Sequence, residues 1–255
     1  LGADTKGKYT VAIGQGALVT QNFTTATDVY NVAVGYRAGV AVTTGIQNTL
    51  VGGLAGDALT DADRNVAIGY SALSTDTLGA RNVAIGRSSL ENQNFTTATD
   101  SYNVAVGYNS GASVTTGKYN TFVGSLAGNA TDDGEGNTAV GYLALSANCG
   151  DHNTAVGSGA LTTCTGQQNT AVGENAGKSI TSGIQNVFMG VDAGDAITSA
   201  NYNVGLGYGA ISLDTLGNRT TAVGTFALDS QNLTTATDTH NTAVGYGAGQ
   251  AVTTG

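Results

Sequence analysis

The chain has 255 residues, a formal net charge of -9 and 39 glycines, and it contains no proline or tryptophan. The acidic balance argues against nucleic acid and anionic membrane surfaces as partners, because both attract basic proteins. Abundant glycine without proline excludes collagen-like and polyproline structures. The hydrophobic residues are mostly Ala and Val. We therefore expect regular, stacked structure in which small residues pack through close backbone approach.

A five-residue motif, Asn-(Val/Thr)-Ala-(Val/Ile)-Gly, recurs from Thr10–Gly14 to Asn241–Gly245, and we call it the pentad. Its fourteen glycines are 16, 17 or 21 residues apart: Gly14, Gly35, Gly52, Gly69, Gly86, Gly107, Gly124, Gly141, Gly157, Gly173, Gly190, Gly207, Gly224 and Gly245. β-Branched residues at alternate positions, closed by glycine, predict a short strand and a turn. The spacing is too short for a helical-pair repeat. We predict an all-β parallel β-solenoid, or β-roll, of about fourteen coils, each with two short strands and two turns.

A longer period lies above the pentad. The fourth residue after each pentad glycine is Leu or Ile in some coils and Gly in others, while one coil in four replaces the central Ala by Leu50, Phe122 or Phe188. Three 21-residue coils share an insert, at residues 21–28, 93–100 and 231–238. We predict one repeat array over residues 1–255 with a four-coil super-repeat of about 70 residues. Because it opens and closes in mid-repeat, we expect a fragment of a longer chain.

Asparagine opens twelve of the fourteen pentads, and stacking predicts a column in which the side-chain amides hydrogen-bond up the stack. We expect this structural ladder to stabilise the solenoid, since removal of one Asn leaves a buried polar group without a hydrogen-bond partner, at a cost of roughly 1–3 kcal/mol. The ladder comprises Asn31, Asn48, Asn65, Asn82, Asn103, Asn120, Asn137, Asn153, Asn169, Asn186, Asn203 and Asn241.

Both faces of the pentad strand are apolar. Alternation sends the second and fourth residues to one face, and the central residue and the glycine to the other. A lone solenoid covers only one of them, and soluble monomers avoid long exposed apolar stripes. We therefore predict a homo-oligomer. The small Ala/Gly face suits close chain contact, so we expect Leu50, Phe122 and Phe188 to lie at the oligomer contact.

The pentads resemble those of two groups of repeat proteins. Val11-Ala12-Ile13-Gly14 and Val66-Ala67-Ile68-Gly69 are similar to strands of the left-handed parallel β-roll head of trimeric autotransporter adhesins. The segments 137–145 and 241–246 resemble the Asn-Thr-Ala-Val-Gly-Tyr arrays of phage tail-fibre-like proteins, and this is the closer match. The resemblance covers the whole chain and implies a trimer. The 17-residue coil and the 21-residue insert coils depart from the adhesin head.

Few residues suggest chemistry. Cys149 and Cys164 occupy adjacent coils and form either a disulfide or two small buried residues. His152 and His240 precede a pentad, where we expect a solvated turn edge and no ligand role. Two acidic groups are expected to be solvated turns, with calcium as the alternative: Asp57, Asp61 and Asp63, and Asp132, Asp133 and Glu135. Asn22, Asn94 and Asn232 begin glycosylation sequons in the inserts. We expect no cofactor and no metal.

These features predict a non-catalytic structural protein: the self-assembling shaft of an extracellular fibre, such as a phage tail fibre, an adhesin stalk or a surface filament. The alternative is a host-surface or glycan-binding adhesin that uses the Thr- and Tyr-rich insert loops. An ice-binding surface would need a flat Thr array, and the second pentad position here mixes Val with Thr. A glycan-cleaving spike would need paired carboxylates, yet Glu91, Glu135 and Glu174 occupy different coil settings.

Overall fold

The computed structural model describes residue 2 and residues 4–255. The chain divides into two compact units, Leu1–Asp133 and Gly134–Gly255, and each is a parallel β-solenoid. The described residues form strands, turns and bends, and they contain no helix. Each unit contributes seven coils with one pentad strand apiece, so the prediction of an all-β solenoid of about fourteen coils is confirmed.

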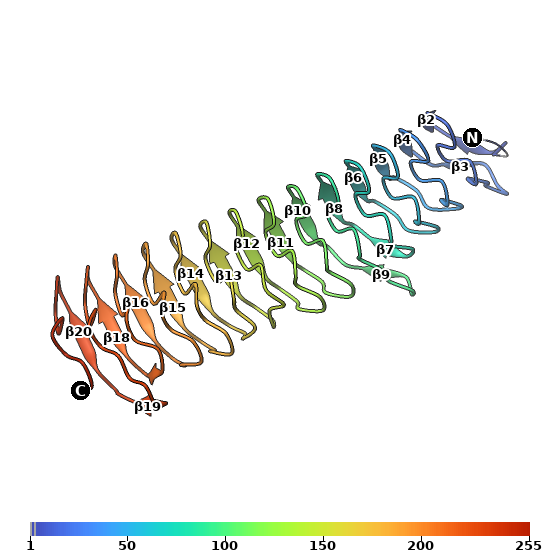
Figure 1. The fold of residues 1–255 in the computed structure, drawn as a ribbon. Helices are drawn as coiled ribbons and strands as arrows, with labels where there is room; N and C mark the ends of the chain where they lie inside the picture. Colours follow the sequence, from blue (N-terminus) through green and yellow to red (C-terminus); the bar gives the residue numbers. More distant parts are fainter. Residues whose placement is uncertain (1, 3) are drawn as a thin grey trace. The chain divides into compact units, whose positions relative to one another are not determined.

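In the first unit the pentad strands pair in parallel and in register, so that each pentad residue faces its counterpart in the next coil. Figure 1 draws them side by side, from blue to green. They are β2 (Val11–Ile13), β4 (Val32–Val34), β5 (Thr49–Val51), β6 (Val66–Ile68), β8 (Val83–Ile85), β10 (Val104–Val106) and β11 (Thr121–Val123). Two-residue strands pair at the inserts: β1 (Gly7–Lys8) with β3 (Thr27–Asp28), and β7 (Gly79–Ala80) with β9 (Thr99–Asp100).

The second unit repeats this arrangement, again with parallel pairing in register. Its pentad strands are β12 (Thr138–Val140), β13 (Thr154–Val156), β14 (Thr170–Val172), β15 (Val187–Met189), β16 (Val204–Leu206), β18 (Thr221–Val223) and β20 (Thr242–Val244). One insert falls in this unit, where β17 (Gly217–Asn218) pairs with β19 (Thr237–Asp238).

Each coil has one three-residue strand, so the expectation of two strands in every coil is wrong. The reason is a recurrent left-handed backbone conformation, which interrupts an extended chain. It occurs before the pentad Asn, as at Arg64 (φ 59°), and two and four residues after the pentad glycine, as at Ser71 (φ 53°) and Leu73 (φ 53°). Backbone hydrogen bonds between coils hold these turns, for example from Leu73 N–H to the carbonyl of Ser89 (3.0 Å).

The pentad glycine is required by both its backbone and its surroundings. Gly69 has φ of 138°, and a Cβ atom placed on it would lie 2.4 Å from the carbonyl oxygen of Gly86 in the next coil. Such an approach is far inside van der Waals contact. The recurrence of this glycine in every pentad therefore follows from the way one coil stacks directly on the next.

The central pentad residue points into the core. Ala67, Ala105, Leu50, Phe122 and Phe188 are all fully buried. The large members lie against the glycines of neighbouring turns, since a Cβ on Gly111 or Gly128 would lie 2.9 Å or 2.5 Å from the Phe122 ring. The longer period of the sequence is thus a packing rule: where two successive turns offer Gly, the pentad of the second coil supplies one large residue that packs against both glycines, and where a turn offers Leu, the pentad of that coil has Ala.

Eleven of the twelve ladder asparagines are fully buried and Asn241 is half-buried, but their bonding differs from the expected chain of side-chain amides. Oδ1 of Asn48 accepts from the backbone N–H of Asn65 (2.9 Å), while its Nδ2 donates to the carbonyl of Ala62 (2.8 Å). Amide-to-amide bonds supplement this pattern in places, as from Asn186 Nδ2 to Asn169 Oδ1 (3.0 Å). Asn48 therefore joins its coil to two backbone groups of the next.

Candidate self-association surface

In each unit, the outward side of the pentad strands carries a stripe of side chains that we call the outer face. In a strand, alternate residues share a face. The outer face therefore comprises the residue before the pentad Asn, the second and fourth pentad residues, and the residue after the pentad glycine. The central residue and the Asn face the core, as the burial of Ala84 and Asn82 within β8 and beside it illustrates. The stripe is four residues wide in each coil.

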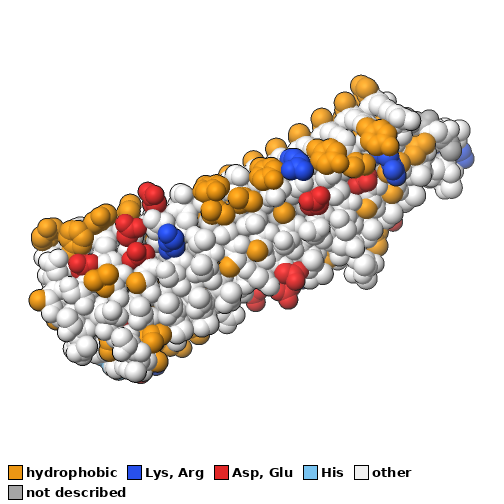
Figure 2. Space-filling model, in the orientation of Figure 1, with side chains coloured by type: hydrophobic (Ala, Val, Ile, Leu, Met, Phe, Trp, Pro, Cys, Tyr) orange, Lys and Arg blue, Asp and Glu red, His pale blue; other side chains and the backbone are white. Residues whose placement is uncertain are grey.

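The two inner columns of the outer face contain no charged side chain in any of the fourteen pentads. The second position is always Val or Thr, and the fourth is Val, Ile, Leu or Met. Several fourth-position side chains are more than a third exposed, including Ile68 (37%), Val123 (37%) and Met189 (46%). Figure 2 shows rows of hydrophobic side chains over the edge of the coils where Figure 1 places β4 to β8.

One flank of the outer face is a column of stacked flat groups. This flank is formed by the residue that precedes each pentad. The rings of Tyr9 and Tyr30 stack there with centroids 5.0 Å apart, and those of Tyr102 and Tyr119 with centroids 6.0 Å apart. The Arg81 guanidinium lies 5.5 Å from the Tyr102 ring centre. Because these side chains stack on one another along the column, their edges, rather than their faces, meet the surroundings.

The opposite flank is the residue after the pentad glycine. Tyrosine recurs there and is about half exposed in each unit, as at Tyr70 (53%) and Tyr142 (54%). Arg87 lies over the Tyr108 ring, 5.7 Å from its centre. Tyrosine combines a large apolar ring with a hydroxyl, a combination that is enriched at protein interfaces.

The size of the outer face suits an interface between proteins. Neighbouring strands lie about 5 Å apart and the four outward residues span about 20 Å, so seven coils present on the order of 700 Å². A stable interface commonly buries about 800 Å² on each partner. The outer face of each unit therefore has the size, the apolar centre and the aromatic rim of a protein interface.

The expectation that Leu50, Phe122 and Phe188 form the oligomer contact is wrong. All three are fully buried inside the single chain. Both strand faces are apolar, and the sequence pattern pairs the residues of a face without indicating which face turns inward. The Ala face turns toward the core because its small side chains leave room for the Leu residues of the turns. The exposed stripe is consequently the Val/Thr and Val/Ile face.

The cysteines are both buried, and no disulfide joins them in this structure. Burial, reinforced by the nearby Cys149 thiol, raises the pKa of Cys164 to about 12. The disulfide alternative stays a prediction. His152 and His240 are exposed beside the pentads, as expected for a turn edge.

The acidic residues do not converge. Among the described residues, no three His, Cys, Asp or Glu side chains gather as a metal site would require. Asp61 accepts a hydrogen bond from Thr44, Asp63 accepts from the N–H of Ile46 (2.8 Å), and Asp132 accepts from Thr115. In the second acidic group, the backbone N–H of Glu135 donates to Asp151 (2.9 Å), while Asp133 is exposed. Asp61, Asp63 and Asp132 thus bond to turns of the chain, whereas Asp57 is half-buried.

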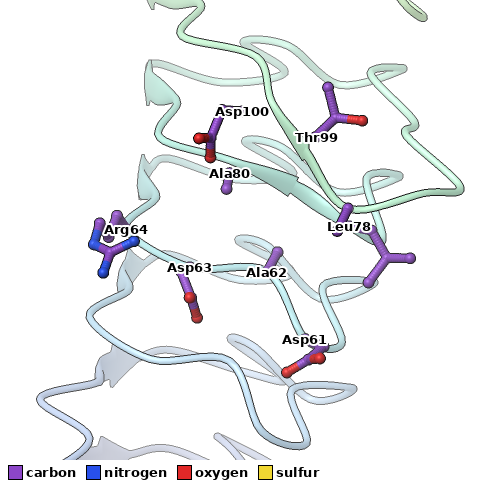
Figure 3. Close-up of a pocket in the computed structure, with 9 residues that line it drawn as sticks. Asp61, Ala62, Asp63, Arg64, Leu78, Ala80, Thr99 and Asp100 are labelled. Carbon is purple, nitrogen blue, oxygen red and sulfur yellow. The ribbon is translucent and has the colours of Figure 1, made fainter.

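A hollow of about 300 Å³ lies beneath the second insert (Figure 3). Residues 61–64 line one side, and Leu78, Ala80 and residues 98–100 line the other. Its carboxylates already have partners within the chain, since Asp100 pairs with Arg81 in addition to the bonds of Asp61 and Asp63. The hollow follows from the overhang of the longer insert coil.

The sequon asparagines sit on the inserts. Asn22 and Asn232 are exposed, whereas Asn94 is half-buried and accepts a hydrogen bond from Thr77 (3.3 Å). The next residue of each insert is anchored in the core, as Phe95 is (7% exposed), while Thr96, Thr97 and Ala98 are exposed.

The described part of the chain has no helix long and apolar enough to cross a bilayer.

Each unit is a parallel β-solenoid with an apolar stripe along one side of its coils. Comparisons with protein-family models, with curated proteins and with solved structures found no match to this chain.

Proposed function

We propose that this chain is a segment of the structural shaft of an extracellular fibre, and that it assembles with further copies of itself through the outer face. The observation that carries the proposal is the absence of charge from both inner columns over fourteen pentads. A surface that met only water would be under no physical constraint to exclude charged residues from so many successive positions. A contact with another protein surface imposes that constraint, because burying an unpaired charge is costly.

A second copy of the chain is the occupant that the repeat favours. A partner that contacts every coil must itself repeat at about 5 Å, the spacing of stacked strands, and another copy does so by construction. The resemblance to phage tail-fibre-like arrays and trimeric adhesin heads supports a homotrimer, a virion fibre or cell-surface filament, and a non-catalytic role. The fine assignment among tail fibre, adhesin stalk and surface filament rests on that resemblance.

Sedimentation of the purified chain tests the assembly. We expect a particle of about three times the 25.3 kDa of one chain. The substitution Ile68→Lys places a charge on an inner column and should shift the mass toward one chain. Thr97→Lys adds the same charge to an exposed insert residue and should leave the mass unchanged. A single-chain mass for the parent protein at tens of micromolar, or equal masses for both variants, would refute the proposal.

Binding through the insert loops is the second candidate, because the Thr-Thr-Ala segment of each insert is exposed beyond its core-anchored Phe or Leu. Such loops could contact a host surface or a glycan. A glycan array probed with the parent protein and with Thr96→Ala/Thr97→Ala tests this role. Binding that is unaffected by the double substitution, or no binding by the parent protein, would count against it.

A further inference from the structure

Wherever a 21-residue insert coil follows another coil, a buried polar trio joins the two. Gln93 of the insert donates from Nε2 to Oδ2 of Asp76 in the preceding coil (2.6 Å). Its Oε1 accepts from Nδ2 of Asn103 (2.8 Å). Asp76 also accepts from the N–H groups of Gly79 and Phe95 (both 3.0 Å). The trio recurs at Asp4, Gln21 and Asn31 and at Asp214, Gln231 and Asn241.

The two cysteines occupy the corresponding place where the insert is missing. Gln93 is the third residue after Leu90, and Cys164 is the third residue after Leu161, the equivalent turn leucine. Cys164 Sγ accepts from Nδ2 of Asn169 (3.6 Å), as Gln93 accepts from its ladder Asn. In the preceding coil, Cys149 lies one position beyond the residue equivalent to Asp76. The cysteine pair therefore replaces the Asp–Gln pair.

The register between the two coils places the cysteines close together. Ser146 donates its hydroxyl to the Thr162 carbonyl (3.2 Å), and Gly150 donates its N–H to the Gly166 carbonyl (3.1 Å). The Leu145 N–H donates to the Ala160 carbonyl (3.0 Å), which stacks Leu145 on Leu161, so counting from this pair Asn148 is level with Cys164 and Cys149 lies one position past it. Strand spacing and a one-residue offset give Cα atoms about 6 Å apart, within the disulfide range.

We propose that Cys149 and Cys164 form an intrachain disulfide that links the two coils in place of the missing Asp–Gln pair. A small-molecule disulfide is the oxidant. One cysteine thiolate attacks it, forms a mixed disulfide and expels one small thiolate. The second cysteine thiolate then attacks the protein sulfur of that mixed disulfide and expels the other. The two protein thiols are oxidised, the small disulfide is reduced, and the two protons pass to the two released thiolates.

Burial determines when this bond forms. Both cysteines are at most 2% exposed, and the pKa of Cys164 is raised to about 12, so very little reactive thiolate exists in the folded, reduced chain. The bond therefore forms while the coils are still open during folding. Once the coils close, the folded chain resists both oxidation and reduction at this position.

Intact mass spectrometry of chain refolded with reduced and oxidised glutathione tests the proposal. We expect a mass about 2 Da below that of the reduced chain, and no alkylation by iodoacetamide in denaturant unless reductant is added first. Two alkylated cysteines without reductant would overturn the proposal. So would a bond found only between chains on a non-reducing gel.

Stability gives a second readout. The oxidised chain should melt several degrees above the reduced chain, because the bond restricts the unfolded ensemble. Cys149→Ser/Cys164→Ser should show no dependence on redox buffer. If that variant does not fold, the comparison of oxidised with reduced parent protein still decides, and equal melting temperatures would count against a stabilising link.

Discussion

The ring of Phe122 occupies the space that a side chain on Gly128 would need, since a Cβ on Gly128 would lie 2.5 Å from Phe122 Cδ1. The same left-handed turn position carries Leu in other coils, for example Leu90 (φ 48°) and Leu145 (φ 52°), and there the central pentad residue is Ala. A large pentad residue and a Leu in the turn of the same coil therefore compete for one space, and no coil has both.

This exclusion predicts strong coupling between the two positions. Phe122→Ala should destabilise the first unit by about 3–5 kcal/mol through cavity formation. Gly128→Leu alone should also destabilise it, because Leu would overlap the ring. The double variant should lose less than the sum of the single losses, since Leu refills the cavity. Thermal melts of the four proteins measure this, and strictly additive losses would contradict the packing rule.

Gly69→Ala tests the requirement for glycine in the pentad. The Cβ would lie 2.4 Å from a backbone oxygen at φ of 138°, so we expect a loss of at least about 3 kcal/mol or failure to fold. Gly53→Ala is the matched control in the same unit. Its Cβ would lie 3.5 Å from the Tyr70 ring, an ordinary contact, and the melting temperature should change little. Equal melting temperatures for the two variants would refute the steric argument.

Asn48→Ala tests the ladder. The substitution leaves the N–H of Asn65 and the carbonyl of Ala62 without their partner, at a cost of roughly 1–3 kcal/mol each. Asn92→Ala, at an exposed position, serves as the control and should be nearly neutral. The measurement is the melting temperature, with hydrogen exchange at Asn65 as a local readout. Unchanged protection of the Asn65 amide in Asn48→Ala would contradict the assignment.

Asp57→Asn tests a half-buried carboxyl whose Oδ1 has no hydrogen-bond partner among the described residues. Burial raises the pKa of Asp57, although the Arg37 charge opposes the shift. Because the pKa is higher in the folded state, folding favours the protonated carboxyl. This contribution to stability is fully present at a pH below the unfolded pKa of about 3.8, and it is lost as the pH rises through the folded pKa. Asn is already present at the equivalent Asn129, so the substitution fits the turn.

We therefore expect Asp57→Asn to melt slightly above the parent protein at pH 7. The gain in the free energy of unfolding should be less than about 1 kcal/mol, because solvent screens the group. The difference should vanish as pH falls below the unfolded pKa, where the carboxyl is protonated in both states. Asp133→Asn, at an exposed position, should show no such trend. A destabilised Asp57→Asn at pH 7 would indicate that the carboxylate has a favourable role.

The pentad strands and the buried Asn ladder could be predicted from the sequence, because stacking repeats a strong local signal at every coil. Which face of the pentad strand turns toward the core could not be predicted. Val66 and Ile68 are as apolar as the core requires, and alternation only establishes that they share a side. The change from Leu90 to Gly128 at the turn position was a usable signal, since the pentads of the same coils change from Ala84 to Phe122.

The left-handed residues were harder to foresee. Tyr30, Gln47 and Arg64 adopt φ of 55–60° before the pentad Asn, although Gly and Asn are the residues that usually favour this conformation. The sequence gives a hint only at Gly136, which occupies the same position. In the other coils, stacking along the column and the hydrogen bonds between coils outweigh the local preference.

Met189 offers the most direct test of the central claim, that further copies cover the outer face. It is the only methionine of the chain, it lies on an inner column, and it is 46% exposed in the single chain. Peroxide oxidation followed by peptide mapping measures its accessibility. We predict that Met189 is protected in the assembled parent protein and is oxidised faster in Ile68→Lys. Equal oxidation rates in the two proteins would contradict the account.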